Sequence, residues 1–315
     1  MAASAVMHLR TPTPAQAALL APHLAATHAV LDDERLVGGL ALAAVRPGAA
    51  ELTFWVSPEQ RRRGVASAAV RALCEQTGER LEMVTDITDT ISQRVALNAG
   101  FTREAVRRGG RLLAGGRRDE VVWARLPGDP PGPAARSLPD LPGGVLGSGE
   151  VTLRPLGIAD VDDIFALLNL TDVRARMVYP FDPTWTGAER RCAVAASEWL
   201  AGIRAAFTVR VNGEFAGDLA MFNEAFCRQA AVGYSMRPEF RGRGAATQAV
   251  RLLSTWAFAI GVQRLVAGTA PDNRASQRVL EKAGFVREAI ERSRFEGPDG
   301  TRVDDFTHVL FPAPG

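Results

Sequence analysis

The chain has 315 residues, yet it contains only three cysteines, one lysine and no long apolar run. Cys74, Cys192 and Cys227 are far apart, which excludes a disulfide framework and a cysteine metal cluster. No window reaches the roughly 18 consecutive apolar residues of a membrane helix, and the first residues lack the basic start of a signal peptide. These absences predict a soluble, cytoplasmic protein. No metal site is expected either, because the four histidines lack ligand spacing; they are His8, His23, His28 and His308.

A charge imbalance is also missing, since the formal net charge is only +2. Lys282 is the only lysine, and the abundance of arginine together with alanine, glycine and proline is typical of a GC-rich genome. Arginines cluster at 61–63, 107–108 and 117–118, but no aromatic residues are interleaved with them to stack on bases. We therefore expect neither a nucleic-acid partner nor a membrane partner.

What the sequence does contain is a repeat. Arginine–glycine segments, RRRGVASAAV at 61–70 and RGRGAATQAV at 241–250, precede two predicted helices, and Gly64 and Gly244 lie 180 positions apart. A second echo follows in the same order, as AGFTREA and then AGFVREA. Two paired echoes indicate an internal duplication. The Pro/Gly-rich stretch 128–148 lies between the copies, so we expect domains at 1–127 and 149–315 joined by this linker.

The second copy alternates strands and helices. Asn212-Gly213 is the strongest short signal for a hairpin turn, and helical apolar spacing marks two helices before it and one after the arginine–glycine segment. The pattern predicts an α/β (α+β) fold with a mixed sheet. The first copy is 36 positions shorter before its hairpin, which removes the counterpart of the second helix. We therefore expect a truncated first domain.

A strand that ends at a glycine-rich turn and then enters a helix presents free backbone N–H groups at the positive end of the helix. Such a point is suited to a phosphate. The segment is not a P-loop, which needs a lysine, and it is not a dinucleotide fingerprint, because Thr247 stands where the third glycine belongs. A plain surface turn is the alternative, and its recurrence in the same strand–turn–helix context argues against it.

The motif Arg241-x-x-Gly244-x-Ala246, repeated as Arg61-x-x-Gly64-x-Ala66, resembles the coenzyme A pyrophosphate signature of the GNAT family of N-acetyltransferases. NRASQRVLEKAGFVREA at 273–289 is similar to a second segment of that family. The later half resembles the branch that acetylates ribosomal-protein N-termini, through LRPL, NLTDV and GYSMRPEFRGRGAATQA. The resemblance implies two tandem GNAT domains, each with a mixed, mostly antiparallel sheet flanked by helices, and acetyl-CoA as the cofactor.

The resemblance also implies positions for the cofactor. The cofactor-binding residues expected in the second domain are Ser235, Met236, Arg241, Gly242, Arg243, Gly244, Ala245, Ala246, Thr247, Asn273 and Ser276. A possible second cofactor site in the first domain comprises Arg61, Arg62, Arg63, Gly64, Val65, Ala66 and Ser67.

In this family a neutral amine attacks the acetyl thioester directly in a ternary complex. Ser276 is then the candidate for protonating the thiolate, although a serine near a helix start is also common for structural reasons. Relatives often carry a glutamate base on the strand before the arginine–glycine segment, where this chain has Ala231 and the first copy has Glu51. Glu224 and Glu296 are candidate bases, but each could be a solvated carboxylate, and a water chain could serve instead. Ser92 matches Ser276, whereas Asp89 matches Asn273 with a charge that opposes a phosphorylated cofactor.

The acceptor pocket of this family is built largely by the first two helices and their loop, which only the second domain retains. Its candidate residues are Tyr179, Phe181 and Trp185, with Trp199 nearby. Alternatively, these aromatic side chains form part of the core.

We expect the second domain to acetylate a primary amine, such as a peptide or protein N-terminus. A small amine (an antibiotic or polyamine) is the alternative acceptor, and an acidic groove would favour it; Asp182, Glu189, Glu198 and Glu224 could supply one. An acetyl-CoA-binding sensor is the other alternative. The first domain would brace the second as an internal pseudo-dimer, in a monomer or a homodimer.

Overall fold

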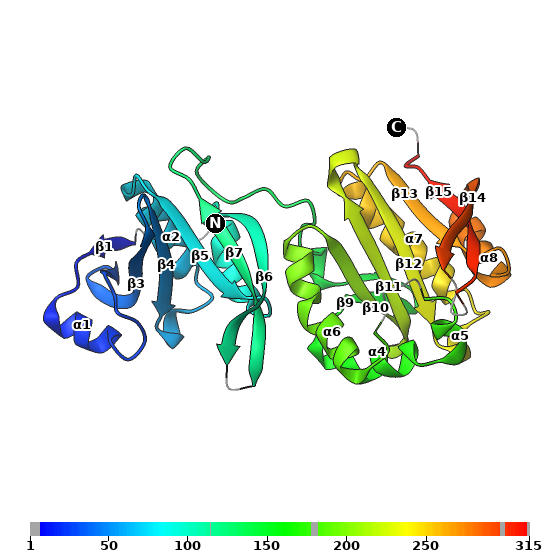
Figure 1. The fold of residues 1–315 in the computed structure, drawn as a ribbon, viewed down its shortest axis with the longest axis horizontal. Helices are drawn as coiled ribbons and strands as arrows, with labels where there is room; N and C mark the ends of the chain where they lie inside the picture. The colour runs from blue at the N-terminus through cyan, green and yellow to red at the C-terminus, as the bar shows by residue number, and fades with distance from the viewer. Residues whose placement is uncertain (1–6, 114, 178–181, 297–299, 314–315) are drawn as a thin grey trace. The chain divides into compact units, whose positions relative to one another are not determined.

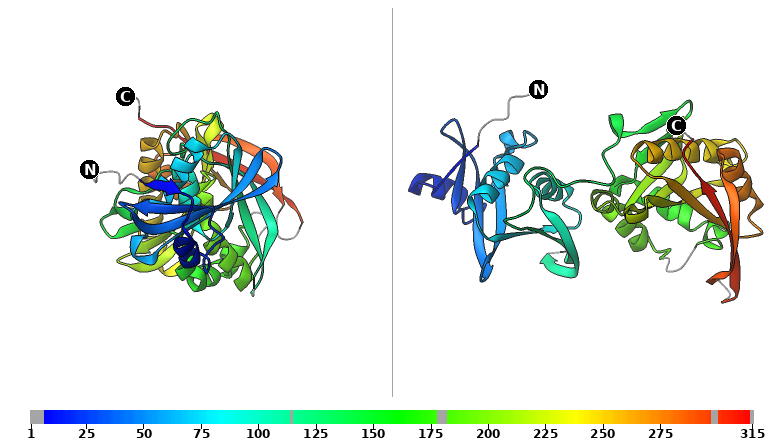
Figure 2. Two further views of the ribbon diagram at one scale, coloured as in Figure 1. Left: turned by 90° about the vertical axis from the view of Figure 1, so that its left-hand side faces the viewer. Right: turned by 90° about the horizontal axis from the view of Figure 1, so that it is seen from above.

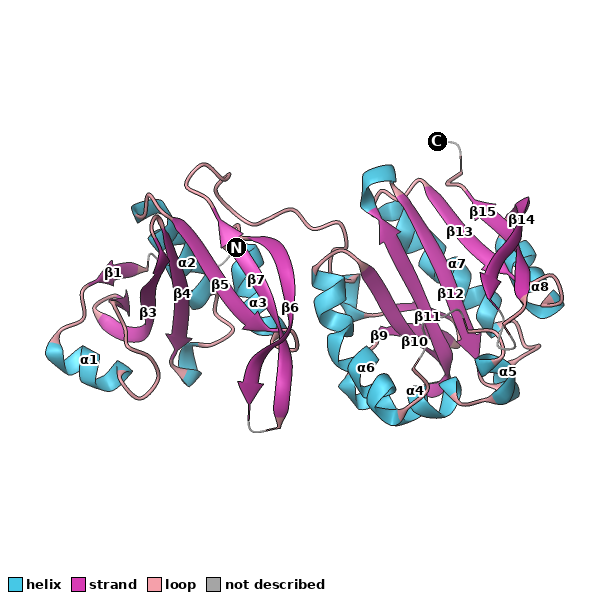
Figure 3. Cartoon of the chain, viewed as in Figure 1, coloured by secondary structure: helices cyan, strands magenta, loops and turns pink. Residues whose placement is uncertain are grey.

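The computed structural model of the chain describes residues 7–113, 115–177, 182–296 and 300–313. Contacts divide it into two compact units, Met1–Ala135 (unit 1) and Arg136–Gly315 (unit 2). Each unit has its own sheet flanked by helices (Figures 1 and 3). The expected α/β fold of two mixed-sheet domains is confirmed. Within the described residues no helix is both long enough and apolar enough to cross a membrane.

Unit 2 contains an eight-stranded sheet in the order β14-β15-β13-β12-β11-β10-β9-β8. Its strands are β8 (Leu146–Ser148), β9 (Val151–Pro155), β10 (Arg204–Val211), β11 (Glu214–Glu224), β12 (Gln229–Met236), β13 (Arg264–Thr269), β14 (Val286–Glu296) and β15 (Arg302–Leu310). Its helices are α4 (Val161–Leu168), α5 (Thr171–Arg174), α6 (Trp185–Leu200), α7 (Ala245–Ala259) and α8 (Arg274–Ala283). Among the strand pairs of the described residues of unit 2, only β12–β13 is parallel. Asn212 and Gly213 both have positive φ, 50° and 86°, as the expected two-residue hairpin turn requires.

Two apolar clusters show which residues lie on each face of the unit 2 sheet. Alternate residues of the central strands, such as Leu219 and Leu265, pack with α7 and α8. The residues between them, such as Ala206 and Ala220, pack with α4 and α6. We call the first the cofactor face and the second the open face, because α4 and α6 cover only the β10–β11 side of it. The side-chain period of two along each strand then decides on which face every site residue lies.

Unit 1 contains a seven-stranded sheet in the order β1-β2-β3-β4-β5-β7-β6. Its strands are β1 (His8–Arg10), β2 (His28–Asp32), β3 (Arg35–Arg46), β4 (Ala49–Val56), β5 (Arg80–Asp86), β6 (Thr102–Leu113) and β7 (Gly116–Arg125). Its helices are α1 (Pro14–Leu20), α2 (Val65–Gln76) and α3 (Thr90–Asn98). Between the first strand and the central hairpin, the described residues form one helix of seven residues, with no counterpart of α6. The expected truncation is therefore present. Figure 2 shows the ribbon from two further sides.

The Pro/Gly-rich stretch between the sheets is packed on the units rather than bare. Ala134 N–H donates a 2.8 Å hydrogen bond to the carbonyl of Leu97 in unit 1. Leu138 is fully buried in unit 2, where the indole of Trp199 donates a 3.0 Å hydrogen bond to the carbonyl of Pro139. Leu141 is buried in the same core, and residues 146–148 form β8, so the stretch supplies two apolar anchors and the predicted linker ends earlier than residue 148.

Candidate active site

The central feature of unit 2 is a V-shaped opening between its two parallel strands. Gln229–Ala231 of β12 pair with Arg264–Val266 of β13, and the pairing ends there. Beyond that point β12 continues to Met236 beside β11, while β13 continues to Thr269 beside β15. The backbone groups of β12 that point toward β13 therefore lose their partners along 232–236. β4 and β5 separate in the same register in unit 1, after Glu51 and Glu82.

The arginine–glycine segment lies at the end of each of these strands and has the same geometry in both units. Gly242 and Gly244 have φ values of 74° and 84°, and Arg62 and Gly64 have 60° and 82°. Helices α7 and α2 begin directly after the second of these residues. Among the described residues, the N–H groups of 243–247 donate no hydrogen bond, and neither do those of 63–67. Each unit thus presents a cradle of free donors at a helix N-terminus, which suits a phosphate group.

The first arginine of each segment contacts the end of the strand that precedes it. Arg241 donates from Nε and Nη2 to the carbonyl of Met236, at 2.9 and 2.6 Å. Arg61 donates from Nε to the carbonyl of Val56 at 3.1 Å. Arg241 also pairs through Nη1 with Asp172 of α5 and holds the pKa of that carboxyl below its usual range. The side chain of Arg241 therefore fixes the end of the strand, and the backbone N–H groups of the segment stay free.

Two hydroxyl groups meet beside the cofactor face. Asn273 caps α8 by accepting a 3.2 Å hydrogen bond from Ser276 N–H, and Asp89 caps α3 in the same way through Ser92. The Ser276 hydroxyl lies 2.8 Å from the Tyr234 hydroxyl. Burial raises the pKa of Tyr234 to about 12 although the Ser276 hydrogen bond lowers it, so the phenol stays protonated. Sequence reasoning missed Tyr234.

The register of the two parallel pairs makes Phe54 the unit 1 counterpart of Tyr234. The hydroxyl pair is therefore present only in unit 2. The loop before each of these helices is, in contrast, held identically. Gln277 donates to the carbonyls of Ala270 and Pro271, and Gln93 donates to those of Asp86 and Ile87.

The open face of the V differs most between the units. In unit 2, Gly233 and Gly268 are exposed and flank the opening without side chains. Their counterparts in unit 1 are Thr53 and Val84, by the same register. Trp55, which replaces Ser235, stacks on His23 with ring centroids 4.0 Å apart. In unit 1, therefore, side chains lie on the face of the sheet that is left open in unit 2.

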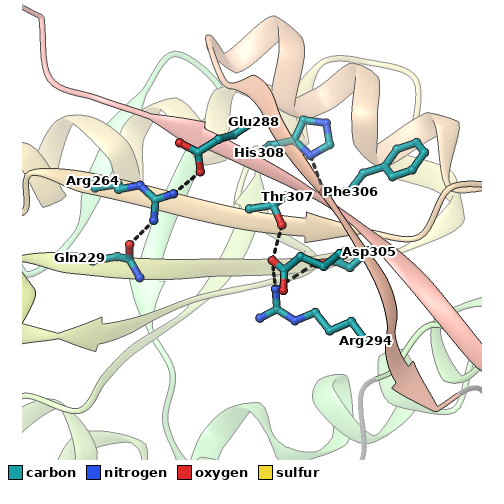
Figure 4. Close-up of polar contacts among 9 residues, drawn as sticks. Gln229, Arg264, Glu288, Arg294, Asp305, Phe306, Thr307 and His308 are labelled. Atoms are coloured by element: carbon teal, nitrogen blue, oxygen red, sulfur yellow. Dashed lines mark hydrogen bonds and ion pairs between the residues drawn. The ribbon is translucent and has the colours of Figure 1, made fainter.

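A buried carboxylate, Asp305, lies on the open face of unit 2 beside β13 (Figure 4). A Cβ atom at Gly268 would lie only 2.5 and 2.7 Å from its two oxygens, so the carboxylate rests directly on that backbone. Arg294 Nη1 lies 3.4 Å from Asp305 Oδ2 and also pairs with Glu291, which accepts a 2.5 Å hydrogen bond from Thr307. Burial raises the pKa of Asp305, and Arg294 partly offsets the rise.

The two carboxylates singled out from the sequence lie elsewhere. Glu296 is exposed at the far end of β14, opposite Arg302. Glu224 ends β11 and accepts a 3.0 Å hydrogen bond from Gln229, at the end of β12 remote from the arginine–glycine segment. The structure thus brings Ser276 to the opening but places Glu224 and Glu296 at strand ends away from it.

The acceptor-side aromatics separate into three groups. Tyr179 and Phe181 lie outside the described residues. Trp185 begins α6, is 46% exposed and donates from its indole to Asp162 at 3.0 Å. Trp199 is core, packed edge-on against Phe207.

The segment that leads from α5 toward residues 178–181 is tied to both cofactor elements. Asp172 pairs with Arg241 at the arginine–glycine segment. Arg176 donates to both oxygens of Asp272, at 3.0 and 3.1 Å, in the loop before α8, and it lowers the pKa of that carboxyl. These two ion pairs hold Asp172 and Arg176 against the arginine–glycine segment and the loop before α8. No group of three or more histidine, cysteine, aspartate or glutamate side chains suited to a metal was found in the described part of the chain.

Comparisons with known proteins agree with this geometry. The family model described as acetyltransferase (GNAT) domain matches 150–286, and the one described as acetyltransferase (GNAT) family matches 6–101. The probable N-acetyltransferase YjcK of Bacillus subtilis (strain 168) is 45% identical over 64 residues, which are 20% of this chain and 35% of that protein. YdaF, a candidate ribosomal N-acetyltransferase of the same organism, is 33% identical over 101 residues, 31% of this chain and 52% of that protein. The chain thus spans about half or less of these curated relatives.

A solved structure of the RimL ribosomal L7/L12 alpha-N-protein acetyltransferase with coenzyme A is similar in fold. It is 19% identical, with a TM-score of 0.50, and the match covers 53% of this chain and 97% of that one. One such domain thus corresponds to about half of the present chain. With a GNAT match in each half and the same V-shaped opening in each sheet, the chain belongs to the GNAT family of acetyltransferases and carries two domains of that family.

Proposed function

We propose that unit 2 is an acetyl-CoA-dependent N-acetyltransferase whose acceptor is the primary amine of a peptide or protein N-terminus. GNAT enzymes use acetyl-CoA as the acetyl donor. One observation carries the assignment to unit 2: its V-shaped opening has a phosphate cradle at one end and an open face flanked by Gly233 and Gly268. Unit 1 has the same cradle, but Trp55 and His23 occupy its open face.

The residues of unit 2 supply three actions. The free N–H groups at 243–247 bind the pyrophosphate. The backbone N–H of Met236, which points toward the opening because that of Arg237 bonds to β11, stabilises the negative charge that develops on the acetyl oxygen. The amine enters from the open face. Ser276, linked to the protonated Tyr234, donates a proton to the departing sulfur and is reprotonated through that hydroxyl.

The base that takes the amine proton is proposed to be Asp305. Its position beside the exposed backbone of Gly268 supports this role, since it faces the side from which the amine enters. The groups around it are Arg294 and Glu291 on β14, His308 on its own strand and the Thr269 backbone on β13. Glu224 and Glu296 remain alternative bases that would have to act from the strand ends.

Asp305→Asn is expected to lower kcat by about 100-fold, the usual range for removing a general base. A carboxylate accepts a proton only when ionised, so kcat should rise with pH through the pKa of Asp305, which is above the ordinary aspartate value. This acidic limb should disappear in Asp305→Asn. Glu224→Gln and Glu296→Gln are the matched controls and should retain both kcat and the limb. Loss of the limb in either control, with Asp305→Asn unaffected, would assign the base to that glutamate instead.

The acceptor is proposed from two observations. YdaF, the relative with the longer match reported above, carries a ribosomal N-acetyltransferase name. The carboxylates that could form an acidic groove for a polyamine are also partly engaged: Glu198 pairs with Arg204 at 2.6 Å, and Asp182 accepts from the backbone N–H and hydroxyl of Thr184. Both observations favour a peptide amine over a small polycation.

The test of the proposed function is an acetyl-transfer assay on the intact protein. Free thiol release from acetyl-CoA should require a peptide with a free α-amine and exceed that with a polyamine, and mass spectrometry should find one acetyl group on the N-terminus. Ser276→Ala should lower kcat by about 100-fold with little change in acetyl-CoA affinity. Binding without thiol release, equal in wild type and Ser276→Ala, would identify a sensor. Release only with polyamines would refute the peptide acceptor.

A further inference from the structure

The tip of the β6–β7 hairpin in unit 1 is strongly basic. Five arginines and no acidic residue lie between 106 and 118, and all five are exposed: Arg107, Arg108, Arg111, Arg117 and Arg118. Arg111 and Arg118 are direct cross-strand partners, an arrangement that destabilises a hairpin because like charges face each other. In the described part of the chain, none of the five forms an ion pair.

The acidic residues closest in sequence lie at the base of this tip. Glu120 is the cross-strand partner of Arg107, and Asp119 accepts a 2.8 Å hydrogen bond from the Gly109 N–H. Arg117 donates only to the carbonyl of Gly109, at 2.9 Å. The positive charge toward the tip is therefore not neutralised within the unit, although the whole chain has a net charge of only +2.

The end of the hairpin is apolar. Leu112 is 71% exposed and Leu113 is 41% exposed. Arg111 and Arg118 lie on one face of the hairpin, and Arg117 lies on the other with Leu112. The arginines therefore form a collar around an apolar tip. The tip projects beyond β5, whose pairing with β7 stops at Glu120 (Figure 1).

The fold itself does not demand this composition. The hairpin at the same place in unit 2, β14–β15, carries Glu291 and Glu296 in addition to Asp304 and Asp305, which correspond by register to Asp119 and Glu120. Its Arg294 is paired with Glu291 and Asp305. The collar and the exposed leucines are thus specific to unit 1.

Contrary to the expectation from the sequence that no membrane is a partner, we propose that this hairpin tip docks end-on to an anionic lipid surface, with Leu112 and Leu113 entering the interface and the arginines contacting the headgroups. An interfacial site of this kind combines apolar insertion with electrostatic attraction to anionic lipids. A nucleic acid would explain the arginines but not the leucines, and residues 102–118 contain no aromatic side chain to stack on bases. Charge on both faces of the hairpin also fits a plane that meets its end better than a duplex that lies along one face.

The test is sedimentation of the intact protein with vesicles. Binding is expected to vesicles containing a third of phosphatidylglycerol and not to pure phosphatidylcholine, and it should weaken with salt. Arg111→Glu with Arg118→Glu should lower the partition coefficient at least roughly tenfold, since each basic residue near such a surface contributes severalfold. Leu112→Ser should lower it severalfold without changing the salt dependence.

The matched control is Arg278→Glu with Arg292→Glu, which makes the same charge change at two exposed arginines of unit 2. This control should bind vesicles nearly as wild type. All four arginines and Leu112 are exposed, so the variants should fold, and circular dichroism checks this. An equal loss of vesicle binding in the control and in the hairpin variant would mean that net charge alone causes the effect, and it would overturn the proposal. Failure of the wild-type protein to bind anionic vesicles would also overturn the proposal. Binding of a nucleic-acid duplex that is equally strong in wild type and in Leu112→Ser would overturn it as well.

Discussion

Replacing Gly244 by glutamate is expected to abolish acetyl-CoA binding to unit 2, with a rise in the dissociation constant of roughly 100-fold or more. Gly244 has φ of 84° and immediately precedes α7. The new carboxylate would therefore lie beside the free N–H groups that are proposed to bind the pyrophosphate. A negative charge there both occupies the donors and repels the phosphates. Isothermal titration of acetyl-CoA into the intact protein measures the effect.

Two control variants are needed. One separates the effect of the charge from the effect of backbone strain, and the other makes the same substitution in unit 1. Gly244→Ala brings the strain of a side chain at positive φ, about 1–2 kcal/mol, without the charge, and no atom lies within 4 Å of the added Cβ. It should therefore weaken binding far less than glutamate. Gly64→Glu makes the same change in unit 1, where Gly64 has φ of 82°.

The stoichiometry decides between the roles of the units. One site that is lost only in Gly244→Glu would support a catalytic unit 2 and a bracing unit 1. Two sites, one lost in each variant, would show that the unit 1 cradle also binds cofactor, although Trp55 and His23 still fill its open face. Unchanged binding in Gly244→Glu would reject the cradle, and an absence of binding by wild type would reject the proposed function.

Asp160→Ala should produce the largest loss of stability, about 2–4 kcal/mol of the free energy of unfolding of unit 2. Asp160 is 1% exposed and accepts from Arg154, from Arg210 Nη2 at 3.2 Å and from the Gly157 N–H at 3.0 Å. Its removal leaves two guanidinium groups and one backbone donor without this partner. The loss stays below that of a fully enclosed pair because Arg154 is 41% exposed.

Urea unfolding followed by far-UV circular dichroism measures this loss in the transition that belongs to unit 2. Asp163→Ala is the matched control on the same helix. Asp163 lies 3.9 Å from Arg210 and is 42% exposed, so its removal should cost less than about 0.5 kcal/mol. A similar shift in both variants would mean that charge count, and not the buried network of Asp160, stabilises this helix start.

The features that could be read from the sequence are local ones. The duplicated segments, the hairpin at Asn212-Gly213 and the helix after Gly244 all depend on residues within a few positions of one another, where backbone preferences and hydrogen bonding act directly. The missing helix of unit 1 was visible for a similar reason, because chain length alone limits what can form between two strands.

The role of single side chains was harder to assign from the motif. Arg241 matches a cofactor signature, but the motif did not show that its guanidinium also contacts Met236 and Asp172; its cofactor role stays a prediction. Asp89 is charged where Asn273 is neutral, and the sequence did not show that both serve as helix N-caps, a place where aspartate and asparagine are equally suited.

The amino-acid sequence by itself determined the duplication, the fold class and the phosphate cradle of each domain. Tertiary structure alone decided which open face is free, because Trp55 meets His23 and Asp305 meets Gly268 only after distant strands have paired. The same holds for Tyr234 beside Ser276, 42 positions apart. Strand register places these residues together, and register depends on hydrogen bonds between segments that no local pattern connects.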